Sequence, residues 1–279
     1  MSRPKLGLSI ETGGLLPLGL RQQAGLATIL GRSMMETHES QTSQTAMTPI
    51  RPMIRCLPLP DFEASNLDKV HAAFADAIPF DLGQAWRTEV EPGFAPGQVR
   101  VGWRRDSLLI LAELTDQDIF TSATEVNQRM WELGDTFEIF LRPADWPEYI
   151  EFHVTPNNLR LQLRIPSTEA LRRAQAANVF DEFLLSGNVF RSVTWVQPEN
   201  QRWFVHAAIP VGAVLRRARL MAGSRWYFSF SRYDYTRGGG EPVVSSTSPH
   251  AVADFHRQQE WGILKFCGCE ITSKPIQEL

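Results

Sequence analysis

Polar side chains recur at every second position in three consecutive apolar segments, residues 136–141, 149–155 and 159–165. Successive side chains of a β-strand point to opposite faces, so this alternation predicts one sheet whose apolar positions face a core. In the third segment we expect the leucines and Ile165 to face inward, and Arg160, Gln162 and Arg164 to face outward. The outward positions then bring together two carboxylates, an imidazole and a guanidinium, namely Glu138, Glu151, His153 and Arg160.

Two kinds of chemistry fit this set, besides the ordinary polar outer face that any antiparallel sheet shows. A pyranose needs a flat ring against its apolar face and charged hydrogen-bonding groups along its hydroxyl rim. Trp131 stands shortly before the first segment and would supply such a ring. Alternatively, Glu138 and Glu151 on adjacent strands could act as acid and base in glycoside hydrolysis, which needs carboxyls about 5 to 9 Å apart.

The rest of the chain predicts the elements that would hold these residues. Strand-like runs are followed or separated by turn residues, such as Asn157 and Asn158 between two of them. Helical spacing is confined to residues 168–177 and 211–216, and strands do not alternate with helices. A mainly β fold follows, an antiparallel β-sandwich of jelly-roll or immunoglobulin-like type with one or two short helices. The nine strands expected are residues 98–103, 108–114, 136–141, 149–155, 159–165, 189–196, 202–209, 225–235 and 261–266.

Composition limits the domain organisation and the partners. The 279 residues carry a formal net charge of -3, which gives no attraction to nucleic acid or to anionic lipid, and we expect no membrane partner. Residues 1–50 show no sustained period and predict a flexible N-terminal arm, followed by a single domain over 51–279. Glu11 and several glycines interrupt the apolar start of the chain, so we expect no signal peptide.

Six segments resemble, in order, the family 9 carbohydrate-binding modules, which belong to a wider DOMON-like group of β-sandwiches that bind sugar or haem. The resemblance covers roughly residues 61 to 266. It implies a non-catalytic bacterial domain that binds a polysaccharide or oligosaccharide, such as plant cell-wall glycan, during polysaccharide catabolism. It also implies a secreted or periplasmic location and a glycoside hydrolase as partner. The segments are VRVGWRRDSLLILAELTD, WELGDTFEIFLRP, YIEFHVTPNN, RWFVHAAIP, RWYFSFSRYDY and EWGILKF.

The resemblance also assigns site residues. A tryptophan before the Gly-Asp-x-x-Glu strand stacks on the sugar in this family, and the strand glutamate binds hydroxyls; they correspond here to Trp131 and Glu138. This chain has one more residue between the tryptophan and the aspartate than the commonest spacing. Where the family uses an arginine and polar groups, this chain has Glu151 and His153. A second ring over the sugar would come from Trp195, Tyr233 or Tyr235.

A haem-binding or electron-transfer domain of DOMON type is the alternative from another class. Methionine and histidine serve as axial ligands in such domains. The residues that could take this part are Met130, His206, His250 and His256.

No other cofactor is expected, apart from structural calcium of the kind some family members carry. Calcium requires several oxygen ligands, and the candidates are Asp116, Asp118 and Asp135. The three cysteines lack the spacing of a tetrahedral zinc site. Cys56 could form a disulfide bond with Cys267 or Cys269, or all three could be free thiols.

Overall fold

The structure is a computed structural model that describes residues 51–214 and 220–268. Every described residue belongs to one compact unit of the chain. The N-terminal arm predicted over residues 1–50 lies outside the described residues. Within the described ranges, no helix has the length and apolar character needed to cross a bilayer.

The first sheet carries the residues singled out above. Its order is β7 (Arg160–Ile165), β6 (Tyr149–Val154), β5 (Thr136–Pro143), β10 (Arg225–Asp234) and β12 (Gly262–Phe266), and these strands pair antiparallel. A short strand, β11 (Val243–Ser246), pairs with β10 on the edge opposite to β5.

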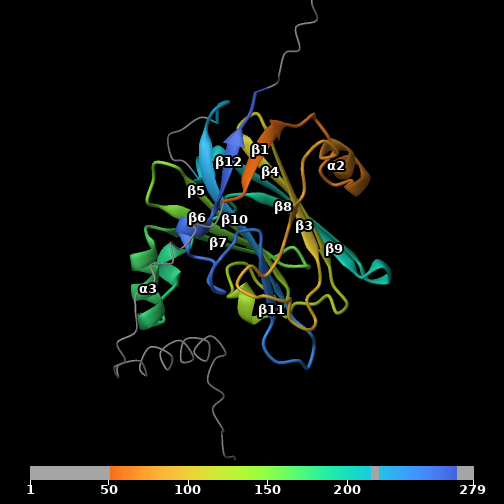
Figure 1. Cartoon of the computed structure of the whole chain (residues 1–279), viewed down its shortest axis with the longest axis vertical. Helices are drawn as coiled ribbons and strands as arrows, with labels where there is room; N and C mark the ends of the chain where they lie inside the picture. Colours follow the sequence, from red (N-terminus) through yellow and green to blue (C-terminus); the bar gives the residue numbers. More distant parts are fainter. Residues whose placement is uncertain (1–50, 215–219, 269–279) are drawn as a thin grey trace, which may run out of the picture. The chain divides into compact units, whose positions relative to one another are not determined.

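The second sheet is joined to the first by β1 (Met53–Pro58), which changes partner along its length. Met53–Cys56 pairs parallel to β12, whereas Leu57 and Pro58 pair parallel to β3. These two parallel pairings depart from the expected all-antiparallel pattern. Through them β1 connects β12 of the first sheet to β3 of the second (Figure 1). The remaining strands are β3 (Gly97–Arg104), β4 (Ser107–Thr115), β9 (Arg202–Pro210), β8 (Arg191–Gln197) and the short β2 (Phe80–Asp81) beside β3.

The main core fills the space between the two sheets. It takes every second residue of the central strands, as strand alternation requires, and includes Phe137, Ile139 and Leu141 of β5. Phe152 of β6 stacks on Phe190, with ring centroids 4.5 Å apart. This mainly β sandwich confirms the predicted fold class, and all nine predicted strands are present.

Short helices cover the outer faces of the sheets. Helix α3 (Thr168–Ala177) matches its predicted bounds, begins at Ser167, whose Oγ accepts a hydrogen bond from the Ala170 N–H, and ends at left-handed Asn178. Helix α2 (Leu67–Ala73) lies on the second sheet and was not predicted. The other helical segments are α4 (Val211–Val214) and the 3₁₀ turns η1 (Met130–Glu132), η2 (Asp181–Phe183), η3 (Pro198–Asn200) and η4 (Gln258–Glu260).

The faces predicted for β7 are wrong. Residues directly opposite in a pair of strands share a face, and Leu163 lies opposite Glu151 while Gln162 lies opposite Phe152. The leucines of β7 therefore face outward, into a second apolar cluster with Leu171 of α3. The polar residues of β7 face the margin of the main core. There, Gln162 donates a hydrogen bond to the Gly187 carbonyl and accepts one from the Val189 N–H.

Candidate functional site

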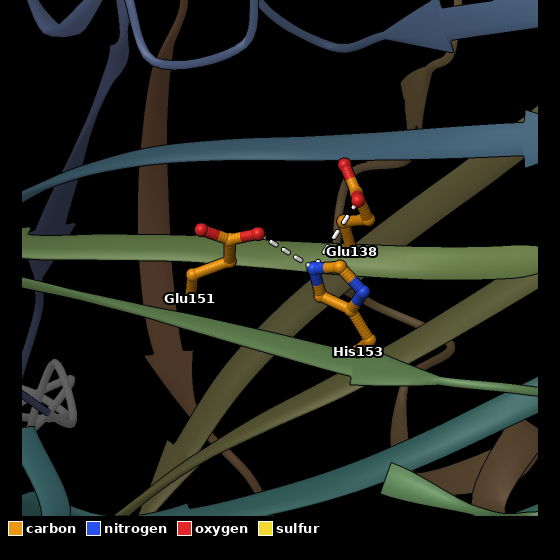
Figure 2. A group of neighbouring side chains, drawn as sticks. All are labelled: Glu138, Glu151 and His153. Atoms are coloured by element: carbon orange, nitrogen blue, oxygen red, sulfur yellow. Dashed lines mark hydrogen bonds and ion pairs between the residues drawn. The ribbon is translucent and has the colours of Figure 1, made fainter. Parts of the chain in front are cut away.

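Glu138, Glu151 and His153 form a tight group on the outer face of β5 and β6 (Figure 2). Glu138 lies directly opposite His153 across the two strands, and Glu151 is two residues before His153 on the same strand. The imidazole Nε2 is 2.7 Å from Glu151 Oε1 and 3.2 Å from Glu138 Oε1. One ring nitrogen thus interacts with both carboxylates. We call these three residues the trio.

The trio is buried, although an outer face of a sheet was expected to be open to water. Glu138 is 3%, Glu151 5% and His153 0% exposed. The reason is the second apolar cluster, which covers this face with α3, η2 and the rings of Phe255 and Trp261. Hydrogen bonding is incomplete at this depth, since Glu138 Oε2 and His153 Nδ1 have no hydrogen-bond partner among the described residues.

The charges of the trio follow from this environment. Burial raises the pKa of Glu138 to about 8. The nearby His153 acts to lower this pKa, and the Glu151 carboxylate acts to raise it further. Burial alone would also raise the pKa of Glu151, but His256 and His153 together lower it. Burial acts to lower the pKa of His153. The Glu138 and Glu151 carboxylates act to raise it and have the larger effect, so the net shift of the His153 pKa is upward. The two carboxylates thus favour the protonated form of His153, and burial favours the protonated form of Glu138.

Trp131 lies next to the trio, on the 3₁₀ turn η1. Its ring meets the His153 ring edge to face at a centroid distance of 5.5 Å, and it also contacts Phe180 at 5.9 Å. The turn is anchored by Met130, which is fully buried. Gly134 then leads the chain into β5 with φ +138°, and a Cβ there would be 2.7 Å from the Phe120 carbonyl oxygen, so glycine is required. Trp131 is partly exposed, as a sugar-stacking ring has to be.

Two further partly exposed rings adjoin the trio. Tyr233 lies near both carboxylates, whose charges add to the effect of burial in raising its pKa. His256 has its Nε2 3.9 Å from Glu151 Oε2, and its Nδ1 is 3.0 Å from the hydroxyl of Tyr149. Sequence reasoning assigned His256 only to the haem alternative, because it lies on a segment without a helix or strand period.

Two of the residues predicted for the site lie elsewhere. Arg160 faces the inner side of the sheet, where it donates a hydrogen bond of 3.0 Å to the Phe190 carbonyl. Trp195 belongs to β8 of the second sheet and packs on the cluster beneath α2. Tyr235, by contrast, is close to Trp131, since its hydroxyl donates to the Trp131 carbonyl oxygen at 2.6 Å.

The aspartates considered for calcium separate into two places. Asp116 and Asp135 gather with Asp234, but buried Arg232 forms ion pairs with Asp116 at 2.9 Å and with Asp234 at 3.0 Å. Burial and the Asp116 carboxylate raise the pKa of Asp135 to about 8.

Asp118 instead pairs with the exposed Arg237. Asp135 accepts hydrogen bonds from the backbone N–H groups of Phe120 and Tyr235, so it joins the strand to two loops next to the site.

Of the residues of the haem alternative, His206 lies apart from the other three. Met130 packs on the outer face of the first sheet and His206 on that of the second. His250 is held by Glu260, 3.2 Å from its Nδ1. The described thiols Cys56 and Cys267 are both free, so the disulfide bond suggested between these two is not present. Cys269 lies outside the described residues.

Similarity to known proteins is found among solved structures. No family model matches the sequence, and no curated protein matches it. Among solved structures, a Bacteroides uniformis ATCC 8492 protein that has been proposed to bind carbohydrate superposes with a TM-score of 0.57 at 16% identity, over 77% of this chain and 97% of that one.

Two structures of a family 9 carbohydrate-binding module from Caldicellulosiruptor kristjanssonii are also similar. The glucose complex gives a TM-score of 0.53 at 15% identity, over 80% of this chain and 100% of that one. The cellotriose complex gives 0.52 at 15% identity, over 80% and 96%. The chain therefore has the fold of the family 9 modules, as the order of its sequence segments indicated.

Proposed function

We propose that this protein binds carbohydrate without cleaving it, at the trio and the adjoining ring of Trp131. The observation that carries the proposal is at Glu138, whose buried Oε2 has no hydrogen-bond partner among the described residues. The partly exposed ring of Trp131 contacts His153 of the same trio. An unsatisfied buried polar atom costs about 1 to 3 kcal/mol; a sugar hydroxyl would donate to Oε2 of an ionised Glu138 and accept from Oε2 of a protonated one. The sugar's C–H face would lie on the Trp131 ring.

Binding requires some movement of the cover, because Glu138 is only 3% exposed. Trp131 and His256 are two of the partly exposed side chains beside the trio. We propose that these rings turn outward to admit the sugar edge, while the backbone of β5 and β6 stays in place. Side-chain rearrangement of this kind is common on binding.

Binding is favoured over hydrolysis by the position of the two carboxylates. Glu138 and Glu151 interact with the same imidazole nitrogen, and their ligand atoms lie within 4.8 Å of each other. A glycosidase has to place the scissile bond between its acid and its base or nucleophile, and here His153 occupies that position. The fold shared with modules solved in complex with glucose and cellotriose also supports binding.

The ligand class that we propose is a polysaccharide or an oligosaccharide, with plant cell-wall glycan as the first class to test. A glycoside hydrolase would be the natural partner of such a domain. Because sugar hydroxyls are well hydrated, the affinity should be modest, in the micromolar range or weaker.

Calorimetry with glucose and cellotriose, together with a glycan array, tests the proposal. We expect one sugar site per chain, and Trp131→Ala and Glu138→Gln should each weaken binding at least about tenfold, or 1.4 kcal/mol. Trp195→Ala is the matched control, because Trp195 is also a partly buried tryptophan but packs on the second sheet. Equal losses in the Trp195 and Trp131 variants, with both folded by circular dichroism, would place the sugar elsewhere.

A further inference from the structure

The trio has the geometry of a set of metal ligands. Glu138, Glu151 and His153 each offer one ligand atom, and these atoms all lie within 4.8 Å of one another. All three side chains project from the paired strands β5 and β6 (Figure 2). Rigid strands of this kind hold metal-binding side chains more accurately than loops do.

We propose that Glu138, Glu151 and His153 bind a divalent transition-metal ion, with zinc as the best fit. The unused hydrogen-bonding capacity of Glu138 supports this, because its Oε2 lacks a partner among the described residues although the side chain is more than nine-tenths buried. A native structure rarely leaves such a buried carboxylate oxygen without a ligand.

The ligand types select the metal. One imidazole nitrogen with two carboxylate oxygens suits zinc, which accepts three protein ligands and keeps a fourth position open. Calcium takes six or more oxygen ligands, and magnesium prefers oxygen atoms in octahedral geometry, so neither matches a set that contains imidazole. Two carboxylates also balance the charge of a divalent ion, which removes most of the cost of burying it.

The unpartnered His153 Nδ1 does not argue against zinc. When Nε2 binds a metal, Nδ1 carries the hydrogen, and it has no acceptor among the described residues. An imidazolium that donates from Nε2 to the carboxylates carries the same Nδ1–H. Metal binding therefore adds no unsatisfied donor to the site.

The metal also extends the proposed function, and this step rests on that proposal. Glu138 Oε1 is 3.2 Å from His153 Nε2 and Oε2 has no partner among the described residues, so the carboxylate can offer either oxygen to the ion. A sugar hydroxyl could then occupy the open coordination position, and the Glu138 oxygen that the ion does not hold could accept a second hydroxyl. We therefore expect zinc to strengthen sugar binding.

The experiment uses the full chain after removal of metals by a chelator. Calorimetric titration with zinc chloride should show one site with a micromolar or lower Kd, and cobalt(II) should give visible absorption bands of a four-coordinate site. Glu138→Gln, Glu151→Gln and His153→Gln should each lower zinc affinity at least about tenfold. The matched controls are Glu132→Gln, a partly exposed glutamate on η1, and His206→Gln, a buried histidine on the second sheet.

The outcomes separate the two proposals. Absence of zinc binding, or binding that survives in all three trio variants, overturns the metal site. Zinc binding that is lost in the trio variants, with thermal unfolding showing that the metal-free variants are folded, supports it. Cellotriose is then titrated with zinc and with chelator: no binding in either condition overturns the proposed function and leaves the metal site standing, whereas equal binding in both overturns only the coupling.

Discussion

The hydroxyl of Tyr235 donates a hydrogen bond of 2.6 Å to the main-chain carbonyl oxygen of Trp131. The backbone N–H of Tyr235 donates to Asp135 Oδ1 at 2.8 Å. The chain just after β10 is therefore tied both to the turn that carries the tryptophan and to the start of β5. Tyr235 therefore holds the main chain of Trp131 in place, and in the proposed site the ring of Tyr235 need not touch the sugar.

Tyr235→Phe removes the bond to Trp131 and keeps the ring. We expect a loss of stability of about 0.5 to 1.5 kcal/mol and a several-fold weaker affinity for cellotriose, because the η1 turn is less firmly placed. Calorimetry and urea unfolding measure the two effects. Tyr227→Phe is the control, since Tyr227 lies at the opposite end of β10; an equal loss of affinity in that variant would show that the effect is unrelated to the Trp131 turn.

Arg232 forms a buried ion-pair network with Asp116 and Asp234. Its guanidinium also donates to the Thr115 carbonyl at 2.6 Å, so it supplies the positive charge that calcium would bring to these aspartates. Removal of one partner from a buried pair costs about 3 to 5 kcal/mol. We therefore expect Arg232→Met to lower the free energy of unfolding by this amount.

Asp118→Asn should cost less than about 1 kcal/mol, because the partner of Asp118, Arg237, is exposed. Urea unfolding of both variants measures the contrast. We further expect calcium to leave the melting temperature of the wild type unchanged. A rise in melting temperature that is lost in Asp116→Asn would instead establish calcium as a ligand of this cluster.

Alternation within strands predicted the inner and outer faces of β5 and β6 correctly, and it failed for β7. In β5 and β6 the large apolar residues, such as Phe137 and Phe152, face the main core. In β7 the equally regular leucines face the second cluster. A pattern of period two shows which residues share a face, but not which face it is when both are covered by apolar side chains.

The cover of the trio could not be predicted for a related reason. Phe255 and His256 come from a segment, residues 247–260, that follows β11 and contains only the 3₁₀ turn η4. Their contacts with Phe140 and Tyr149 span more than 100 positions in the chain. The strands and the position of Glu138 were predictable from local pattern, whereas the burial of Glu138 depends on these distant contacts.

Arg160 provides a test of the corrected face. Its guanidinium bonds to the Phe190 carbonyl and lies over the Phe190 ring, 5.7 Å from the centroid. Arg160→Ala should therefore lower stability, by about 1 to 3 kcal/mol for the lost charge-assisted bond, and leave cellotriose affinity within about twofold of the wild type. Glu138→Gln should show the reverse order of effects. If Arg160→Ala abolished sugar binding in a folded protein, the site would have to include the inner face.

His206 is expected to make the protein less stable in weak acid. It is buried against Phe62 and Phe74, and its Nδ1 lies 3.0 Å from the Ile110 carbonyl oxygen. Burial lowers the pKa of His206, the nearby Arg104 adds to this, and the hydrogen bond to Ile110 opposes it. Above the unfolded pKa of about 6.5 both states are neutral and the stability is fully present.

As the pH falls below that value, the unfolded chain takes up a proton at this position before the folded chain does. Stability is then lost, with a slope of at most about 1.4 kcal/mol per pH unit for this one group. Urea unfolding between pH 7.5 and 5 measures the slope, and His206→Phe should make it shallower even though the variant loses the bond to Ile110. NMR titration of the imidazole provides a direct check, since a folded-state pKa at or above 6.5 would contradict the account.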